Sequence, residues 1–342
     1  MNRKVTSHDV AKAAGVSRSA VSLVLNGRAD GVISAENQRA VRSAATSLGY
    51  RPNRVARSLR NQSTHTIGVI TDSIMSGAFG GAMISGATLR AAEADYLLLV
   101  MGTEDDPDKE REAIDTLQAR QVDALVFAAG GLRPWSPPEA FLREQNVLLD
   151  AVDPEARTAC VVADEFEGGY QAAKLLIEAG HQRITYLSGT TDLLATGRRL
   201  QGFHRAMAGA GLEPHSVTCG WEINNGLDVG TRVLDVAEPP TGVMCANDRA
   251  AAGAFLAAAR LGLRVPEDLS VVGYDDDPNV APQLGLSTVG LPHRQMGERA
   301  IELLLDRLEG REVPVGETLV DSPVVHRTSV APPRRKARPS IR

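Results

Sequence analysis

Residues 5–27, VTSHDVAKAAGVSRSAVSLVLNG, contain two short helical patterns separated by a glycine. Thr6 precedes Asp9 by three positions, which is the spacing of a capping box at the start of a helix. Ser17 can cap a second helix, which Asn26 and the glycine after it would end. Two short helices joined by a tight, glycine-containing turn are typical of a helix-turn-helix.

The second of these helices has two chemically different faces. At about 100° per residue, its small and apolar residues share one arc and would pack against a core: Ala20, Val21, Val24 and Leu25. The opposite arc presents a guanidinium, two hydroxyls and an isobutyl group: Arg18, Ser19, Ser22 and Leu23. A protein that reads the major groove needs a bidentate donor for guanine, small hydroxyls and an apolar tip for a thymine methyl. A third helix, capped by Ser34 and ending near Leu48, would complete a small all-α module.

Charge is distributed unevenly along the 342 residues. Residues 1–62 hold eleven Lys or Arg and three Asp or Glu, a net charge of +8. The totals of 37 basic and 42 acidic residues leave 26 and 39 for residues 63–342, a net charge of −13. A basic module ahead of an acidic body predicts that the module binds a polyanion, and double-stranded DNA fits its helices. A small helical bundle that binds another protein is the alternative.

Residues 5–27, together with the motif Leu48-Gly49-Tyr50-x-Pro52-Asn53-x-x-Ala56-Arg57-x-Leu59, resemble the headpiece and hinge of the lac/gal repressor family of bacterial transcription regulators. The resemblance implies that three residues read bases in the major groove: Arg18, Ser19 and Leu23. It implies further DNA contacts, mainly to phosphates, at Thr6, Ser17, Ser22, Asn26, Ser34, Tyr50 and Asn53.

Residues 49–62 are expected to form a hinge helix that is too short to be stable alone and orders on DNA. The resemblance implies that Leu59 from each of two subunits enters the minor groove at the centre of a pseudo-palindromic operator, beside Ala56 and Arg57. The loop 27–33 is about two residues longer than the usual family loop. The Asn37-Gln38 pair also replaces a Thr-Arg pair common in the family, so one phosphate contact should differ.

From Thr66 onward, apolar runs typical of strands alternate with helical patterns. The predicted strands are 67–70, 96–100, 124–127, 147–149, 184–187, 242–245 and 269–272. The predicted helices lie near 79–94, 108–120, 166–180, 196–211, 226–237, 248–262 and 293–309. This alternation predicts parallel sheets covered on both faces, and the length predicts two Rossmann-type lobes. The resemblance implies a periplasmic-binding-protein-like α/β body behind the helix-turn-helix headpiece.

The expected domains are a headpiece, a hinge helix, an effector-binding and dimerisation body, and a disordered basic tail: 1–48, 49–62, 63–331 and 332–342. Within the body, the resemblance implies one lobe of 63–160 with 292–320 and another of 161–290 with 321–331. The tail has no heptad leucines. Because a headpiece of this size needs two half-sites for useful affinity, a homodimer is expected.

Several polar residues follow predicted strands, and ligands of open α/β sheets bind at the carboxyl ends of strands. An acid that faces an arginine across a cleft can clamp vicinal hydroxyls, while an aromatic ring covers a sugar face. We therefore expect a small-molecule effector, most simply a carbohydrate. The implied effector-binding residues are Asp72, Phe79, Asp150, Arg199, Trp221, Asn247 and Asp275. Position 291 is Leu, where the family commonly has a polar residue.

Simpler explanations exist for some of these positions. Asp248 and Asp276 are equally compatible with turn or capping roles at strand ends. Asn247 can cap the helix that follows it, and Trp221 can be a core residue. Arg199 and Asp275 are the two strongest candidates.

No catalytic residues, metal ligands or cofactors are predicted, because the motifs GxSxG, HExxH, the P-loop and strand-linked GxGxxG are missing from the sequence. The cysteines, Cys160, Cys219 and Cys245, lack metal-ligand spacing, and His181 is expected at a helix-to-strand turn. The sequence has neither an apolar run of about 20 residues nor a signal-peptide core. We therefore expect a cytoplasmic, nucleoid-associated protein without membrane contact. A transporter's solute-binding protein would share the body but not the basic headpiece, and an enzyme would need a catalytic constellation.

Overall fold

The computed structural model describes residues 5–50, 63–72, 80–191 and 193–334. The chain forms two compact units, Met1–Thr64 and His65–Arg342, and each is considered by itself. None of the helices in the described segments is long and apolar enough to cross a membrane.

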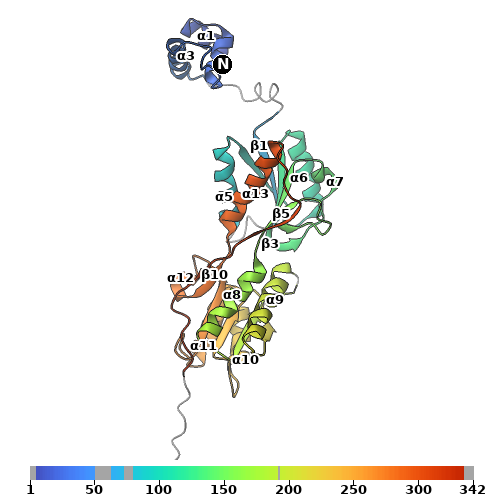
Figure 1. The fold of residues 1–342 in the computed structure, drawn as a ribbon, viewed down its shortest axis with the longest axis vertical. Helices are drawn as coiled ribbons and strands as arrows, with labels where there is room; N and C mark the ends of the chain where they lie inside the picture. The colour runs from blue at the N-terminus through green and yellow to red at the C-terminus, as the bar shows by residue number, and fades with distance from the viewer. Residues whose placement is uncertain (1–4, 51–62, 73–79, 192, 335–342) are drawn as a thin grey trace, which may run out of the picture. The chain divides into compact units, whose positions relative to one another are not determined.

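The first unit is a small helical module. Its helices are α1 (Ser7–Ala14), α2 (Arg18–Leu25) and α3 (Ala35–Ser47) (Figure 1). Each helix contributes at least one fully buried valine to a shared core: Val10, Val21 and Val41. The three predicted helices of the headpiece are therefore confirmed.

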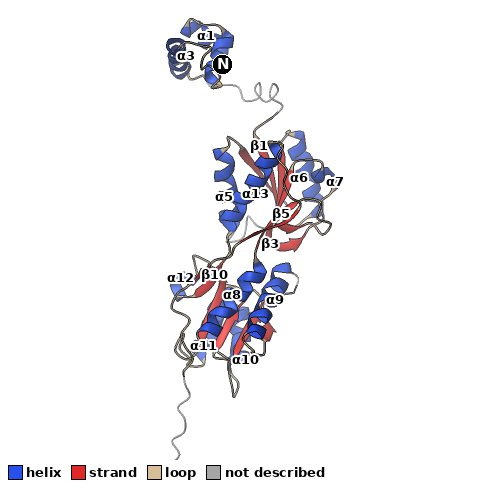
Figure 2. Ribbon diagram, in the orientation of Figure 1, coloured by secondary structure: helices blue, strands red, loops and turns tan. Residues whose placement is uncertain are grey.

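The second unit contains two six-stranded sheets with helices on both faces (Figure 2). The first sheet has the order β11-β5-β4-β3-β1-β2, and all its strand pairs are parallel. Its strands are β1 (Thr66–Thr71), β2 (Leu97–Gly102), β3 (Ala124–Pro134), β4 (Asn146–Val152), β5 (Ala159–Ala163) and β11 (Gly316–Val320). One face is covered by α5 (Gly80–Glu93) and α13 (His293–Leu308), and the other by α6 (Pro107–Ala119) and α7 (Glu139–Leu142).

The second sheet has the order β12-β10-β9-β8-β6-β7, in which only β12 is antiparallel to its neighbour. Its strands are β6 (Ile184–Ser188), β7 (His215–Thr218), β8 (Gly242–Cys245), β9 (Ser270–Asp275), β10 (Ser287–Gly290) and β12 (Val324–Val325). One face is covered by α8 (Glu165–Glu178) and α9 (Leu194–Gly209), and the other by α10 (Ile223–Leu234), α11 (Asp248–Arg260) and α12 (Ala281–Leu284).

The chain crosses between these two lobes three times, after β5, after β10 and after β11. The crossing segments are hydrogen-bonded to one another. The Asp164 backbone N–H donates to the carbonyl of Val320 at 2.9 Å, and the Gly290 N–H donates to that of Pro323 at 2.8 Å. α13 therefore belongs to the first lobe although it follows most of the second lobe in sequence, and it lies beside α5 (Figure 1).

The predicted strand–helix alternation is confirmed, since every predicted strand and helix of the body overlaps an observed one. The pattern missed β5, β7, β10, β11 and β12, because β5 follows β4 without an intervening helix and the others are short or partly polar. The predicted lobe boundary between residues 160 and 161 falls inside β5, so it was placed too early.

The C-terminal segment is ordered past the predicted start of the tail at residue 332. His181 at the turn between α8 and β6 contacts the carbonyl of Ala331 through Nε2 at 2.9 Å, and the Ser270 hydroxyl donates to the same carbonyl at 3.0 Å. Arg334 pairs with Asp268 at 2.8 Å. The tail prediction was therefore wrong for residues 332–334, and its remainder lies outside the described residues, as does the hinge from residue 51 onward.

Candidate functional site

The exposed side of α2 carries the groups predicted to contact DNA. The Ser17 hydroxyl accepts a hydrogen bond from the backbone N–H of Ala20 at 3.1 Å and so begins the helix. Arg18 and Ser19 in the next positions are exposed, whereas Ala20 is buried. The predicted separation of a packing face from an open face is confirmed at these positions.

The end of α2 is more constrained than the sequence suggested. The Asn26 amide donates to the Ser22 hydroxyl at 3.1 Å, so these two polar groups are joined. Leu23 is half-buried and packs partly against the headpiece core. Its side chain is therefore only partly open to a ligand in the described module.

The long loop 27–33 is held by a residue that the sequence analysis treated only as a departure from the family. Gln38 Nε2 donates to the carbonyl of Ile33 at 3.0 Å and to that of Ala29 at 3.4 Å. Ala29 itself is only 2% exposed and joins the core. The loop is thus folded back onto α3, and Gln38 has an internal structural role.

The other predicted DNA-contacting residues of the headpiece have local structural partners. The Asp9 carboxylate accepts hydrogen bonds from the Thr6 backbone N–H at 2.9 Å and from its hydroxyl at 2.7 Å. The Ser34 hydroxyl caps α3 by accepting from Asn37 N–H at 3.3 Å. Tyr50 packs partly against the core. The remaining predicted contacts lie outside the described residues: Asn53, Ala56, Arg57 and Leu59.

In the body, Arg199 of α9 is the most constrained of the predicted effector residues. It is 3% exposed, and its Nε and Nη2 donate to the two carboxylate oxygens of Glu165 at 2.6 and 2.9 Å. Nη1 donates to the carbonyl of Ala246 at 2.7 Å and lies 3.9 Å from Asp275. The guanidinium also stacks 3.7 Å above the ring of Tyr274.

Two glycines bring Glu165 and Arg199 together, because they let α8 and α9 approach closely. A Cβ atom at Gly169 would lie 2.3 Å from the carbonyl oxygen of Arg199, and one at Gly202 would lie 2.1 Å from the carbonyl oxygen of Phe166. Neither position leaves room for a side chain. The ion pair is thus a consequence of the helix crossing.

Glu165 was not predicted from the sequence. It stands between Asp164 and Glu167 in the first turn of α8, where acidic residues are common because they interact favourably with the helix dipole. The three acids look alike in sequence, yet only Glu165 is buried, at 3% exposure. Its burial arises from the contact with α9, which the local pattern does not encode.

Four carboxyl groups and Arg199 lie where the two lobes meet. The charges of Glu165 and Arg199 also affect the pKa of His293, at the start of α13. We call this group the inter-lobe cluster: Asp72, Asp150, Glu165, Arg199, Asp275 and His293. Burial raises the pKa of Asp150 to about 8, with further increases from the charges of Glu165 and Asp72 and a decrease from Arg199. The first lobe supplies Asp150 and the second supplies the ion pair, so their charges interact across the lobes.

The two central acids of the cluster have unusual backbone conformations. Asp150 has a φ of 55° and Asp275 a φ of 103°, both in the left-handed region that side chains disfavour. Burial also raises the pKa of Asp275 well above its ordinary value, while Arg199 partly opposes that change. Buried acids on strained backbone at the carboxyl ends of β4 and β9 are typical of a binding site.

Asp72 and His293 border these two acids. The Asp72 carboxylate accepts from the backbone N–H of Gly130 at 2.9 Å and lies 3.3 Å from Arg133. Burial lowers the pKa of His293 to about 4, which keeps its ring neutral near neutral pH. His293 is the second member of the cluster that the sequence analysis did not identify.

The structure also tests the simpler explanations. Asn247 Oδ1 caps α11 by accepting from the Ala250 N–H at 2.8 Å. Asp248 is buried and accepts from the Thr288 hydroxyl at 2.7 Å, whereas Asp276 pairs with Arg327 at 2.7 Å. All three side chains therefore have structural partners, and Asn247 is the helix cap that was considered as an alternative.

Trp221 is half-buried and lies close to Arg199. Its Nε1 donates to the Thr190 hydroxyl at 2.9 Å, and its ring packs on Gly189, where a Cβ would lie 2.3 Å from it. The Arg199 guanidinium is 5.8 Å from the ring centre. Trp221 is thus both a packing residue and a neighbour of the cluster, while Phe79 lies outside the described residues.

A second contact joins the lobes away from the cluster. Arg198 of α9 makes a two-point ion pair with Glu317 of β11, with both N–O distances 2.7 Å. In addition, Ala195 at the start of α9 packs into the core of the first lobe. The first turns of α9 therefore hold the two lobes together.

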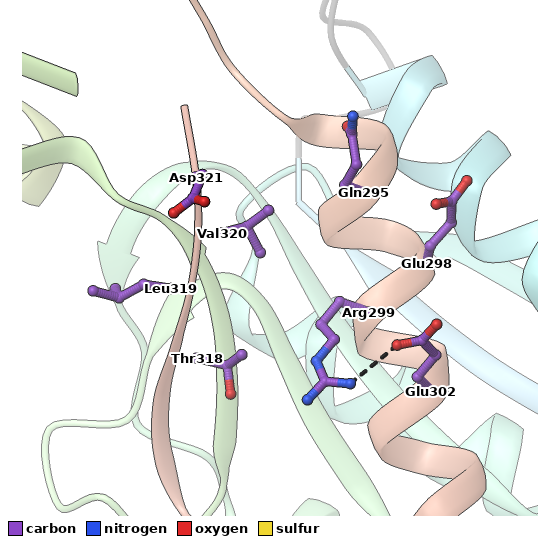
Figure 3. A pocket seen from close by; sticks show the side chains of 8 residues that line it. All are labelled: Gln295, Glu298, Arg299, Glu302, Thr318, Leu319, Val320 and Asp321. Carbon is purple, nitrogen blue, oxygen red and sulfur yellow. Dashed lines mark hydrogen bonds and ion pairs between the residues drawn. The ribbon is translucent and has the colours of Figure 1, made fainter. Parts of the chain in front are cut away.

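A separate groove of about 400 Å³ lies between α13 and β11 (Figure 3). Its lining residues are Gln295, Glu298, Arg299, Glu302, Thr318, Leu319, Val320 and Asp321. Arg299 is paired there with Glu302 at 3.0 Å, as the dashed line marks. The groove shares no residue with the inter-lobe cluster, and no group of side chains in the described segments could hold a metal ion.

Comparisons with known proteins agree with this architecture. A model described as bacterial regulatory proteins, lacI family, matches residues 6–53, and a periplasmic binding protein-like domain matches residues 173–330. The transcriptional repressor PurR of Mannheimia succiniciproducens is 32% identical over 95% of this chain and 98% of its own length. The ribose operon repressor of Haemophilus influenzae is 33% identical over 89% of this chain and 92% of its own.

A similar solved structure is that of the lac repressor dimer bound to operator and the anti-inducer ONPF. It has a TM-score of 0.78 and 27% identity, and the match covers 96% of this chain and 100% of that one. A helix-turn-helix headpiece with a two-lobed α/β body defines a DNA-binding transcriptional regulator, and its relatives are repressors rather than enzymes. The chain belongs to the LacI family.

Replacing Asp150 with Asn is expected to make the free energy of unfolding less dependent on pH. The pKa of this carboxyl rises from 3.8 to about 8 on folding, so its ionisation destabilises the body increasingly as the pH rises between these values. The stability advantage of the variant should therefore grow by about 2 kcal/mol or more between about pH 5 and pH 8. Chemical denaturation at both pH values measures it. Asp115→Asn, an exposed change on α6, should give no such growth, and equal behaviour of the two variants would contradict the burial of Asp150.

Removing the partner of Arg199 is expected to destabilise the body strongly. Glu165→Ala leaves a buried guanidinium without its carboxylate and should lower the free energy of unfolding by about 3–5 kcal/mol. Exposed Glu167→Ala on the same helix should change it by less than about 0.5 kcal/mol. The apolar double variant Glu165→Leu with Arg199→Met should recover most of the loss in a denaturation experiment. A double variant as unstable as Glu165→Ala would show that the ion pair is not the cause.

Proposed function

We propose that this repressor binds a pseudo-palindromic operator as a homodimer in the cytoplasm, and that a small-molecule effector between the lobes of its body sets its operator affinity. The effector is most simply a carbohydrate. The observation that carries the proposal is the inter-lobe cluster: in one lobe Arg199 pairs with Glu165 at 2.6 Å and lies 3.9 Å from Asp275, and the other lobe contributes the buried Asp150, whose pKa their charges affect. A ligand at this position contacts both lobes at once.

The headpiece supports the DNA-binding half of the proposal. Arg18 and Ser19 are exposed at the start of a capped helix, and the first 62 residues carry a net charge of +8. A guanidinium in this position can pair with the O6 and N7 atoms of guanine in the major groove. The surrounding polar residues would contact phosphates, which fix the register of the helix on the duplex.

The chemistry of the cluster supports the effector half. Carboxylates accept hydrogen bonds from the hydroxyls of a polyol, and Trp221 offers an aromatic face beside Arg199. The name of one relative, the ribose operon repressor, is consistent with a carbohydrate ligand. Asp72, Asp150 and Asp275 are the proposed hydrogen-bond acceptors for it. Asn247 and Phe79 remain proposed contacts from the family resemblance.

Effector binding and operator binding would be coupled through the relative arrangement of the two lobes. A ligand that binds one arrangement of the lobes better than another shifts the population toward that arrangement. The resemblance to the family implies that the hinge residues transmit this change to the operator: Ala56, Arg57 and Leu59. The coupling free energy would be about 1–3 kcal/mol and reciprocal, so operator binding would change effector affinity by the same factor.

The DNA-binding role predicts a selective effect of Arg18→Ala. Selection from a random duplex library should yield a twofold-symmetric sequence, and the variant should bind it about 5- to 150-fold more weakly, because one bidentate base contact is lost. Arg205→Ala, which removes an exposed charge of the body, should leave the affinity within about twofold. Fluorescence anisotropy with selected and scrambled duplexes measures both. No enriched sequence, or equal losses on both duplexes, would contradict base reading by Arg18.

The effector role predicts that Asp275→Asn separates the two activities. Asn tolerates the positive φ of this position and keeps the shape, but it removes the carboxylate. Operator affinity without ligand should stay within about twofold, while the ligand-induced change in that affinity should fall at least about tenfold. The measurement is operator binding with and without a compound that stabilises the wild-type body. An unchanged ligand response would place the effector elsewhere.

A further inference from the structure

The positive charges of the inter-lobe cluster are already matched by the protein. Arg199 gives its Nε and Nη2 donors to Glu165 and one Nη1 donor to the carbonyl of Ala246. Arg133, at the edge of the cluster, contacts Asp72 at 3.3 Å and Asp105 at 3.2 Å. Each of the two guanidinium groups therefore already has a carboxylate beside it.

No other cation in the described body compensates the acids of the cluster. His293 is held neutral near neutral pH, since burial lowers its pKa to about 4. The undescribed segment nearest in sequence, residues 73–79, contains no basic residue, and position 192 is an aspartate. An anionic ligand would therefore meet carboxyl groups, and both nearby guanidinium groups already lie beside a carboxylate, with Nε of Arg133 as their one buried donor without a partner in the described body.

Several polar groups of this region lack a hydrogen-bond partner among the described residues, including the Asp150 carboxyl, the Thr196 hydroxyl and Nε of Arg133. The Asp150 carboxyl is 7% exposed, and neither a hydrogen bond nor an ion pair satisfies it there. The Thr196 hydroxyl, 3% exposed and one turn before Arg199 on α9, is also unsatisfied within the described chain. Buried polar groups without partners cost free energy, so a ligand that supplies donors to them gains that free energy on binding.

Asp275 adds a third acceptor with an incomplete partner. Its side chain is 8% exposed, and its contact with Arg199 is an ion pair at 3.9 Å, beyond hydrogen-bond distance. Asp275 thus lies beside a guanidinium that Glu165 already pairs with, and the buried Asp150 of the other lobe is affected by the charge of the same guanidinium. Each of the two acids can accept a hydrogen bond from a ligand. A protonated amine donates up to three hydrogen bonds, and its positive charge favours the ionised form of these acids, whose pKa values burial raises in the unliganded body. A neutral hydroxyl has no such charge.

We infer that the effector is a small polyhydroxylated molecule that carries a protonated amine, such as an amino sugar, and that phosphorylated or carboxylated ligands are excluded. Asp150 and Asp275 determine this specificity by accepting from the amine. Glu165 contributes to this specificity indirectly, because it accepts the hydrogen bonds of Arg199 that an anionic ligand would otherwise accept. The inference rests on the proposed effector site and adds the charge class of the ligand.

The test uses the full-length protein and matched probes that differ only in charge. Glucosamine, glucose and glucose 6-phosphate form one set, and galactosamine, galactose and galactose 6-phosphate form another. A fragment library divided into amines, neutral alcohols and carboxylates extends the comparison beyond hexoses. Thermal-shift and calorimetric titrations on the wild type and on Asp275→Asn identify the ligands whose binding depends on the cluster.

Cluster-dependent binding is expected to be concentrated among the amines, with at least about tenfold higher affinity than for the neutral counterpart and none for the anion. Asp150→Asn and Asp275→Asn should each reduce amine affinity at least about tenfold, and by a larger factor than they reduce the affinity of a neutral ligand bound by the same acids. The exposed changes Asp115→Asn and Asp228→Asn, in α6 and α10, are matched controls that should alter neither.

The possible failures are distinguishable. Cluster-dependent binding of neutral or anionic probes at equal or higher affinity would overturn the charge inference and leave the proposed effector site in place. Binding that is insensitive to both Asp150→Asn and Asp275→Asn, or no binding by any class of probe, would overturn the proposed site itself and the inference with it.

Discussion

The buried ion pair of Glu165 and Arg199 is the constraint on which the rest of the body's candidate site depends. Moving both charges out of water costs several kcal/mol for each ion, and their attraction compensates only when the remaining donors and acceptors are satisfied. Here both carboxylate oxygens accept from the guanidinium, and a third donor reaches the carbonyl of Ala246. The main effect of such a pair is to hold the Arg199 side chain in one rotamer, and its contribution to net stability is smaller. The close crossing of α8 and α9 at their glycines makes that geometry available.

This pair also organises the acids around it. With the guanidinium neutralised by Glu165, Asp150 and Asp275 remain buried on left-handed backbone with incomplete partners. Both features cost stability, and the packed ends of β4 and β9 maintain them. A protein that retains such strain where two lobes meet has a site whose free energy falls when a suitable ligand arrives. Sensitivity to the ligand and limited stability of the empty body therefore have the same structural origin.

The sequence predicted much of the fold because the relevant signals are local. Capping at Ser17 and Ser34, the two faces of α2 and the strand–helix alternation all depend on residues within a few positions of one another. The residues that were missed depend on distant contacts. Gln38 bonds across a loop, Glu165 is buried only through α9, and edge strands such as β11 need a partner strand far along the chain. Family resemblance was enough to identify most residues of the candidate site, such as Arg199, but it did not predict the partner with which each one interacts, such as Glu165.

The placement of α13 and β11 has a consequence for how the chain matures during translation. The strands β1, β3, β4 and β5 are made early, but α13, which covers one of their faces, is made only after the whole second lobe up to β10. Apolar side chains of that face, including Ile67, Val69 and Val147, have no complete cover while more than a hundred further residues emerge, as the positions of β5 and α13 imply. A nascent chain of this topology therefore exposes an apolar surface that chaperones can bind until α13 packs against the sheet.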